Sequence, residues 1–448
     1  MRSHRLAIWV FCVPLAALAA ARARDGGTLR IALPPEVGAD VAAETPEAAS
    51  VRELTAAPLC RLGPDGHPVP VLASLERRGD AVAVVPRPGV RFPSGTPLGA
   101  AELARAWLRG PATGTVGRGL LAPLRGGLST LEAARQSKEP VLLLPLAFPW
   151  PDLEASLCHP ALAPQRDTGT SLEGIGPYAP DGAERARAAP GFPEGRPHPD
   201  TLEVRALSLR NARRALQRHE VQAVFGDGAD GAEPGLFATY LVLRPAAQAL
   251  GQRVAARLDR RALVQSFVGG ASAPLPGLLP AALGGPAEAA VAAAPAGTAS
   301  PAVLLYASDR PAHRAVAERL QILLRDASAP LTLRGLPARE AAAAWERGEG
   351  DAMLRSVLLP PLPAPALAVV LALSGDAEAA RRELPALGAV SDATQRGAKA
   401  AERALALAPT LPLLPLYVES ARVRLDPRVV DVRRDAFGLW MLDDAWWP

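Results

Sequence analysis

The chain has 448 residues, of which 49% are hydrophobic and 21% are charged, and this balance is typical of a globular protein of two or three domains. The formal net charge is +4, but residues 1–23 carry Arg2, Arg5 and Arg22 and no acid, so 49 minus these three leaves 46 bases against 45 acids. A nearly neutral chain lacks the basic surface that binds nucleic acid or an acidic membrane, so these partner classes are excluded.

The amino terminus has the layout of a secretory signal peptide. Two arginines precede the apolar run 6–21, and small residues follow it. The run of about 16 residues is shorter than the roughly 18 to 20 that span a bilayer, which favours a cleavable signal over an uncleaved anchor. We expect cleavage after Ala23, a mature chain that begins at residue 24, and a periplasmic location.

The three cysteines support no metal site. Cys12 lies in the apolar run behind bulky residues, where a lipid-attachment cysteine needs small ones, so a lipoprotein is the less favoured interpretation. In an oxidising compartment Cys60 and Cys158 can be paired or can be two buried thiols, and the thiols are slightly favoured. Because no histidine pairs with another at ligand spacing, His159 predicts no metal, and we expect no cofactor.

The first half of the chain mixes short strands with helices. A Pro-Asp-Gly turn at residues 64–66 predicts a connection between two short strands, and the continuous apolar character of residues 141–146 predicts a buried strand. The remaining expected strands lie at 26–33, 81–86, 201–207, 221–225 and 237–243, and the expected helices at 100–108, 129–136 and 210–219.

A capped helix opens the second half. The Asp259 carboxylate can accept the first amide hydrogens of a helix that begins at Arg260, while Leu258 can pack on Leu263. Gly269 and Gly270 predict its end, because glycine adopts the left-handed conformation of a helix C-terminus.

Strands and helices then alternate in the second half. Strands at 303–307, 331–334 and 352–357 are separated by helices at 310–327 and 338–347, which predicts an open α/β layer. A helix at 391–407 and a strand at 413–418 follow. Ligands of such sheets bind outside the carboxyl ends of the strands. That position here contains Arg355 and Ser356.

Enzyme signatures are missing. The sequence has no G-x-S-x-G, no local histidine–carboxylate pair and no zinc motif, so we expect no catalysis. Residues 226–231 satisfy G-x-G-x-x-G, but Pro234 interrupts the helix that a dinucleotide site requires. This segment is interpreted as a loop.

Several separately placed motifs resemble the family 5 extracellular solute-binding proteins, the peptide and nickel receptors of ABC importers. These motifs are GGTLR at 26–30, residues 60–73, which follow the L-x-x-x-x-D-G-x-x-x-P-x-L-A pattern with Cys60 in its first position, R-P-G-V-R-F at 87–92, GIGPY at 174–178, and the L-D-R-R-A-L segment beginning at Leu258. The resemblance covers nearly the whole mature chain.

The resemblance implies an α/β, two-lobed periplasmic-binding-protein fold of type II-like topology, with an extra inserted subdomain and with chain crossovers near Pro245 and Ser420. Its expected parts are a discontinuous first lobe (24–48, 172–246 and 420–448), the inserted subdomain (49–171) and a second lobe (247–419).

The implied function is an extracytoplasmic solute-binding component of an ABC importer, which closes on a peptide or related small solute, acts with an inner-membrane permease and is monomeric. One motif departs from the family. Where peptide-binding relatives carry W-x-x-D-x-x-D-P, whose first aspartate receives the peptide ammonium, residues 357–363 contain no acid and no aromatic residue. The alternative function is therefore a degenerate receptor fold in a non-transport interaction or sensing role.

Position in the two lobes selects the candidate ligand-binding residues. They are Glu36, Trp150, Tyr240, Arg355 and Ser356.

Overall fold

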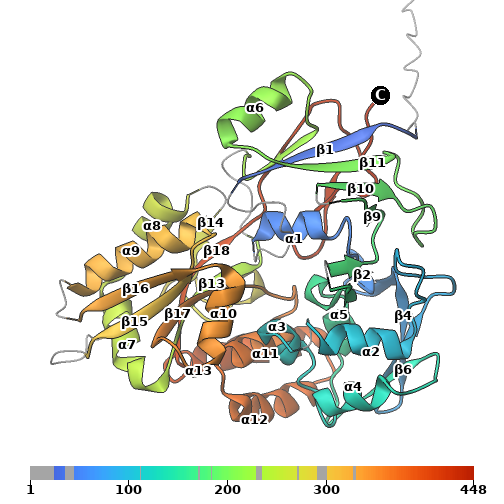
Figure 1. The fold of residues 1–448 in the computed structure, drawn as a ribbon. Helices are drawn as coiled ribbons and strands as arrows, with labels where there is room; N and C mark the ends of the chain where they lie inside the picture. The colour runs from blue at the N-terminus through green and yellow to red at the C-terminus, as the bar shows by residue number, and fades with distance from the viewer. Residues whose placement is uncertain are drawn as a thin grey trace, which may run out of the picture.

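The computed structural model describes residues 25–35, 45–110, 113–169, 172–182, 184–228, 235–269, 272–289, 300–325 and 329–448. The expected signal peptide and Glu36 lie outside the described residues. Two six-stranded sheets and a smaller three-stranded sheet organise the chain. Figure 1 shows the first sheet at the top, the second at the lower left and the three-stranded sheet at the lower right. In the described part, no helix has both the length and the apolar character to cross a membrane.

The first sheet gathers both ends of the described chain. Its order is β19-β12-β1-β11-β10-β9, and the central β1 runs parallel to β11 and β12. Leu29, Ile31 and Leu33 alternate along β1 and pack in one core with α1, as expected of a strand buried between two layers. The elements are β1 (Thr28–Leu33), α1 (Pro46–Arg52), β9 (Tyr178–Pro180), β10 (Arg185–Ala188), β11 (Thr201–Ala206), α6 (Leu209–Gln217), β12 (Ala223–Phe225) and β19 (Val423–Leu425).

The inserted subdomain has its own sheet, β4-β5-β6. The predicted buried strand is β6, but it lies at the edge of this sheet and Leu143 is 50% exposed. The expectation of a strand buried on both faces was wrong, because β6 is an edge strand in which Leu142 and Leu144 are buried while Leu143, on the other face, is exposed. The elements are β2 (Cys60–Leu62), β3 (Pro68–Pro70), β4 (Ala73–Arg78), β5 (Ala81–Pro86), α2 (Ala100–Leu108), α3 (Thr115–Leu120), α4 (Leu128–Ala134), β6 (Leu142–Pro145), α5 (Leu153–Leu157), β7 (Gln165–Asp167) and β8 (Leu172–Gly174).

The second sheet has the order β14-β18-β13-β17-β15-β16. The Asp259 cap is confirmed, since its Oδ1 accepts from the Ala262 amide at 3.0 Å, and Gly269 ends the following turn with φ of 70°. The strands are β13 (Phe237–Leu243), β14 (Ser272–Pro274), β15 (Ala302–Ala307), β16 (Leu331–Leu336), β17 (Ala352–Leu358) and β18 (Leu413–Glu419). The helices are α7 (Gln248–Arg257), α8 (Arg260–Leu263), α9 (Pro311–Arg325), α10 (Ala338–Glu346), α11 (Pro363–Leu373), α12 (Ala377–Gly388) and α13 (Ala393–Leu407).

The chain changes sheets earlier than the expected crossover near Pro245. β13 pairs along its length with β17 and β18 of the second sheet, so the change falls between Phe225 and Phe237. The return lies between Glu419 and Val423, and a short hairpin, β20 (Arg433–Arg434) with β21 (Trp440–Met441), closes the chain. All seven residues of β13 are buried, so its apolar pattern fits either sheet and does not indicate which one it joins.

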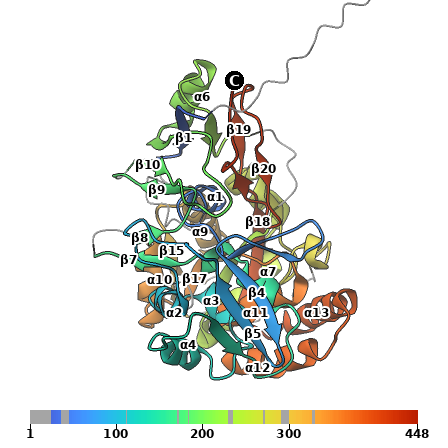
Figure 2. The same cartoon turned by 90° about the vertical axis from the view of Figure 1, so that its right-hand side faces the viewer.

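The inserted subdomain packs directly against the helices of the second sheet, and Figure 2 shows α3 beside α11. The contact is close: a Cβ on Gly119 of α3 would lie 2.6 Å from the Val369 Cα of α11. Leu120 and Trp150 from one side share a single buried cluster with Leu367 from the other. The subdomain and the second lobe therefore have a continuous apolar core.

Cys60 and Cys158 form a disulfide, which corrects the slightly favoured interpretation as free thiols. The first lies in β2 and the second directly follows α5, with 4.6 Å between their Cα atoms, a separation suited to a disulfide. Both cysteines are fully buried in the same cluster. Packing brings together two residues that are 98 positions apart.

Two carboxylates meet where α1 approaches the end of β18. Glu47 is partly exposed, and its Oε1 accepts from the Arg422 amide at 3.4 Å. Burial, and next the charge of Glu419, raise the pKa of Glu47 from 4.5 to about 7. Glu419 in turn pairs with Arg310 at 3.2 Å, and burial raises the Glu419 pKa as well.

Replacing the Glu47 carboxylate at this junction by a neutral group is expected to raise the free energy of unfolding, and the size of this gain should depend on pH. An acid with a raised folded-state pKa stabilises fully below its unfolded pKa of 4.5, and that stabilisation is lost as the pH rises through about 7. Glu47→Gln keeps the acceptor for Arg422. It should match the parent near pH 4 and exceed its free energy of unfolding by up to about 3 kcal/mol at pH 8. Urea unfolding at both pH values measures the difference, and a gap independent of pH would contradict the assignment.

Candidate functional site

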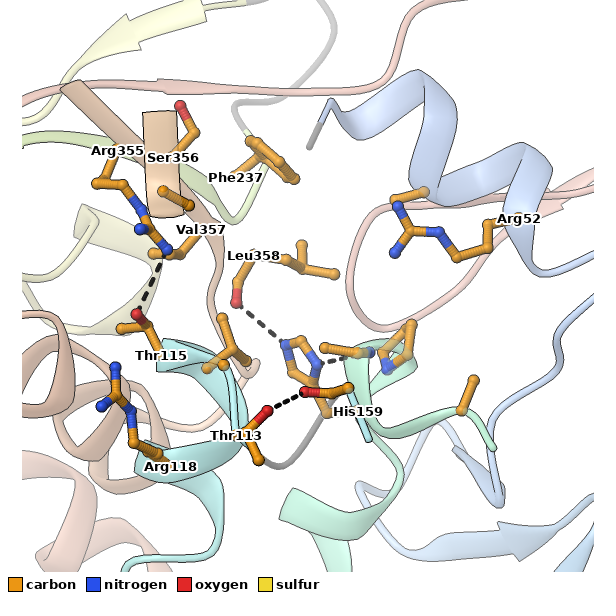
Figure 3. A pocket seen from close by; sticks show the side chains of 18 of the residues that line it. Arg52, Thr113, Thr115, Arg118, His159, Phe237, Arg355, Ser356, Val357 and Leu358 are labelled. Atoms are coloured by element: carbon orange, nitrogen blue, oxygen red, sulfur yellow. Dashed lines mark hydrogen bonds between the residues drawn. The ribbon is translucent and has the colours of Figure 1, made fainter. Parts of the chain in front are cut away.

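A cavity of about 620 Å³ lies where three parts of the fold meet. Arg52 comes from α1, which packs on the first sheet although the expected bounds placed residue 49 onward in the inserted subdomain. Residues 113–118 and 159–165 come from the inserted subdomain, and the second sheet contributes the end of β17. Figure 3 shows Arg355, Thr115, Arg118, His159 and Arg52 around this space. A cavity of this size at a junction of domains is the usual form of a small-molecule site.

Arg355 brings a buried positive charge to the cavity. It is only 8% exposed, and its register partner on β13 is Tyr240, so both side chains project from the same face of the sheet. One guanidinium nitrogen donates to Thr115 Oγ1 at 3.3 Å (Figure 3), while Nε is buried without a hydrogen-bond partner. Among the described residues, no carboxylate forms an ion pair with it.

Ser356 belongs to a buried polar chain on the opposite face of β17. Its Oγ lies 2.6 Å from Thr239 Oγ1 and 2.9 Å from His313 Nε2. Arg310 also points at His313 Nε2, at 3.0 Å. Since a guanidinium only donates, Nε2 accepts both bonds, and Ser356 is the donor of its own.

The distance between Ser356 and His313 would suit a nucleophile and its general base. The surroundings of His313, however, prevent it from acting as a base. Burial, then Arg310 and Arg355, hold the pKa of His313 well below its usual value. A buried histidine that accepts a bond from the Arg310 guanidinium accepts a proton poorly. The chain therefore orients Ser356 without activating it.

His159 connects the inserted subdomain to the end of β17. Its Nε2 donates to the Leu358 carbonyl at 3.1 Å, and its Nδ1 accepts from the Ala161 amide at 3.1 Å (Figure 3). Burial lowers its pKa to about 4, so the ring is neutral at physiological pH. Both nitrogens are used, and no cluster of three or more potential metal ligands occurs among the described residues.

The segment that departs from the family motif forms an apolar wall, of which Val357 and Leu358 line the cavity. Leu358 and Leu359 are buried, and α11 then begins at Pro363 with apolar side chains on all sides, nearly all of them buried. The described residues that line the cavity include one carboxylate, Glu346, and it pairs with Arg118 at 3.2 Å.

The structure brings only some of the predicted site residues together. Arg355 and Ser356 line the cavity. Trp150 and Tyr240 do not: Trp150 packs between Phe148 and Gly388, and Tyr240 donates to the Leu278 carbonyl at 2.8 Å. Both are 1% exposed or less, because each fills the core that joins the subdomain to the second lobe.

Sequence reasoning missed Arg52, Thr115 and Phe237 as lining residues. Thr115 opens a short helix in a glycine-rich stretch, and nothing local marks it as a partner of a residue 240 positions away. His159 was considered only as a metal ligand. Its position between two parts of the fold required the tertiary structure.

The described part of the G-x-G-x-x-G segment is structural. Asp227 is 2% exposed and accepts from Arg213 and Arg424, with closest distances of 2.9 Å to each. The side-chain bond from Arg213 lowers its pKa most among the attractive contacts. This carboxylate is committed to joining α6, β12 and β19.

No protein-family model matches the sequence, and no curated protein sequence matches it. Solved structures match along almost its whole length. OppA of Burkholderia pseudomallei has a TM-score of 0.70 at 15% identity, covering 95% of this chain and 99% of that one. NikA of Staphylococcus aureus in complex with Ni(L-His)₂ has a TM-score of 0.67 at 14% identity, covering 94% and 100%.

The chain has the fold of the family 5 solute-binding proteins. This confirms the fold that the motifs implied. Two solved structures of one protein, MppA, match this chain to different degrees. The Escherichia coli murein tripeptide binding protein MppA matches with a TM-score of 0.68 at 15% identity, covering 94% of this chain and 98% of that one.

The unliganded open form of MppA reaches a TM-score of only 0.53 at 14% identity, covering 94% and 97%. The share of each chain that matches is almost unchanged, so the lower score reflects how the parts are arranged. The lobes of this family 5 fold are therefore placed differently from that open form, in agreement with the close contact of α3 and α11.

Proposed function

We propose that this protein is the extracytoplasmic solute-binding component of an ABC-type importer. The observation that carries the proposal is the cavity that the first lobe, the inserted subdomain and the second sheet enclose together. A site built from separate lobes binds solute most tightly when the lobes are closed, and closure is the signal that a permease reads. The role includes export through the signal peptide at 1–23 and action as a monomer with an inner-membrane permease.

The names of the matched structures support a binding role. They include an oligopeptide-binding protein, a murein tripeptide binding protein and a protein in complex with Ni(L-His)₂. A binding protein is also consistent with the Ser356–His313 pair, whose histidine is held neutral by burial and by the neighbouring Arg310.

Solute binding predicts a rise in thermal stability. A solute at 100 times its Kd adds about 2.7 kcal/mol to the free energy of unfolding, so the melting temperature should increase and saturate across a panel of peptides, amino acids, organic acids, sugars and metal complexes. Ala343→Trp, at the rim of the cavity, should abolish the shift. Glu340→Trp on the same helix, exposed and outside the cavity lining, is the matched control.

A second function competes with transport. The apolar wall at 357–363 and the continuous core between α3 and α11 favour a degenerate receptor that acts in interaction or sensing. If no solute class changes the melting temperature, the transport proposal fails and this alternative gains.

A further inference from the structure

We infer that the cavity takes a small organic acid that carries no free ammonium group, held by its acidic oxygens at Arg355 and Thr115. This inference names the solute class of the site and so rests on the proposed function. It derives from the charges that the described residues place around the cavity.

The buried guanidinium of Arg355 has no counter-charge among the described residues. Taking a cation out of water is expensive unless a counter-charge and hydrogen bonds compensate. Arg355 is 8% exposed and donates one bond, to the hydroxyl of Thr115. Its Nε remains buried without a partner, and among the described residues no carboxylate forms an ion pair with it. An oxyanion from the solute would supply the missing counter-charge.

The other charged residues that line the cavity do not reverse this positive charge. Arg52 and Arg118 also line it, and Glu346 is already paired with Arg118. His159 is neutral, with both nitrogens engaged. The described lining therefore has more positive than negative charge, and a guanidinium fork matches the planar, two-oxygen geometry of a carboxylate.

The end of β17 provides no carboxylate that could bind the ammonium group of a solute. Residues 357–363 contain no acid, and the Leu358 carbonyl already accepts from His159. An ammonium buried against this apolar wall would lose its water without gaining a carboxylate there. A zwitterionic solute would thus gain at one end and lose at the other.

Peptides blocked at either end test the inference. For one tripeptide sequence, four forms are compared by thermal shift and by calorimetry with the full-length mature protein: free, N-acetylated, C-amidated and blocked at both ends. Simple mono- and dicarboxylates and their primary amides complete the panel. We expect the acetylated acid to bind at least tenfold more tightly than the free peptide, and amidation of the carboxylate to abolish binding.

Variants separate recognition from structure. Arg355→Met should remove the response to acids while raising the melting temperature of the unliganded protein, since a buried, unpaired cation is replaced by an apolar side chain. Thr115→Val should weaken acid binding and leave the fold intact. Arg109→Met, exposed and outside the cavity lining, should change neither property.

The outcomes distinguish this inference from the proposed function. If free peptides or amines stabilise the protein and acids do not, the inference is overturned while the receptor function stands. Acid binding that survives Arg355→Met overturns the assigned site. If no member of this panel binds, the inference is overturned, and the receptor function is overturned as well only if the sugars and metal complexes of the wider panel also fail to bind.

Discussion

Removing the Cys60–Cys158 disulfide is expected to lower the free energy of unfolding by about 4 to 5 kcal/mol. The bond closes a loop of 98 residues, and the loss of chain entropy that a crosslink imposes on the unfolded state grows with loop length. The double replacement Cys60→Ala with Cys158→Ala leaves no cysteine in the expected mature chain, which begins at residue 24. Both residues are fully buried in the subdomain core, so the effect should appear in the transition of that part of the molecule.

Urea unfolding followed by tryptophan fluorescence measures this effect, because Trp107 and Trp150 lie in the same cluster. The parent protein in excess reductant should approach the stability of the variant, whereas the variant itself should not respond to reductant. Equal midpoints for the oxidised parent and the variant would show that the crosslink contributes nothing.

Breaking the Asp152–Arg396 pair is expected to cost about 3 to 5 kcal/mol, the usual consequence of leaving one buried charge unpaired. Arg396 on α13 donates two bonds to Asp152 just before α5, at 2.8 and 2.5 Å, with 4% and 12% of the two side chains exposed. The same guanidinium also donates to the Val390 and Ser391 carbonyls. The pair joins the inserted subdomain to the second lobe.

Asp152→Ala tests this expectation, with chemical denaturation as the measurement. The control is Asp80→Ala, which breaks an exposed pair with Arg125 and should cost about 1 kcal/mol or less. Combining Asp152→Leu with Arg396→Met should recover most of the lost stability, since two apolar residues leave no charge buried. A loss for Asp152→Ala no larger than that of the control would contradict the buried character of the pair.

Much of the candidate site was beyond prediction from sequence. Arg355 and Ser356 were found because ligands gather at the carboxyl ends of strands, a rule that depends on local strand order alone. Trp150 and Tyr240 were chosen by position along the chain, yet both fill the core between the subdomain and the second lobe. A large aromatic residue in an apolar run has the same appearance whether it faces a solute or a neighbouring helix.

Local chemistry was sufficient for the elements themselves. The Asp259 cap, the glycine stop at Gly269 and the strand–helix alternation from residue 302 to residue 358 each depend on interactions within a few residues. These features could be predicted from the sequence because neighbouring residues determine both the hydrogen bonds at helix ends and the side-chain periodicity. The motifs that resemble the family 5 proteins are of the same kind.

Only the tertiary structure decided the rest. It assigned β13 to the second sheet, paired Cys60 with Cys158, and set Thr115 against Arg355 across 240 positions. Each of these depends on which surfaces pack together. Because the hydrophobic effect is non-directional, an apolar pattern in the sequence does not identify the surface against which it packs. The charge balance of the cavity, and with it the expected solute, follows from that packing.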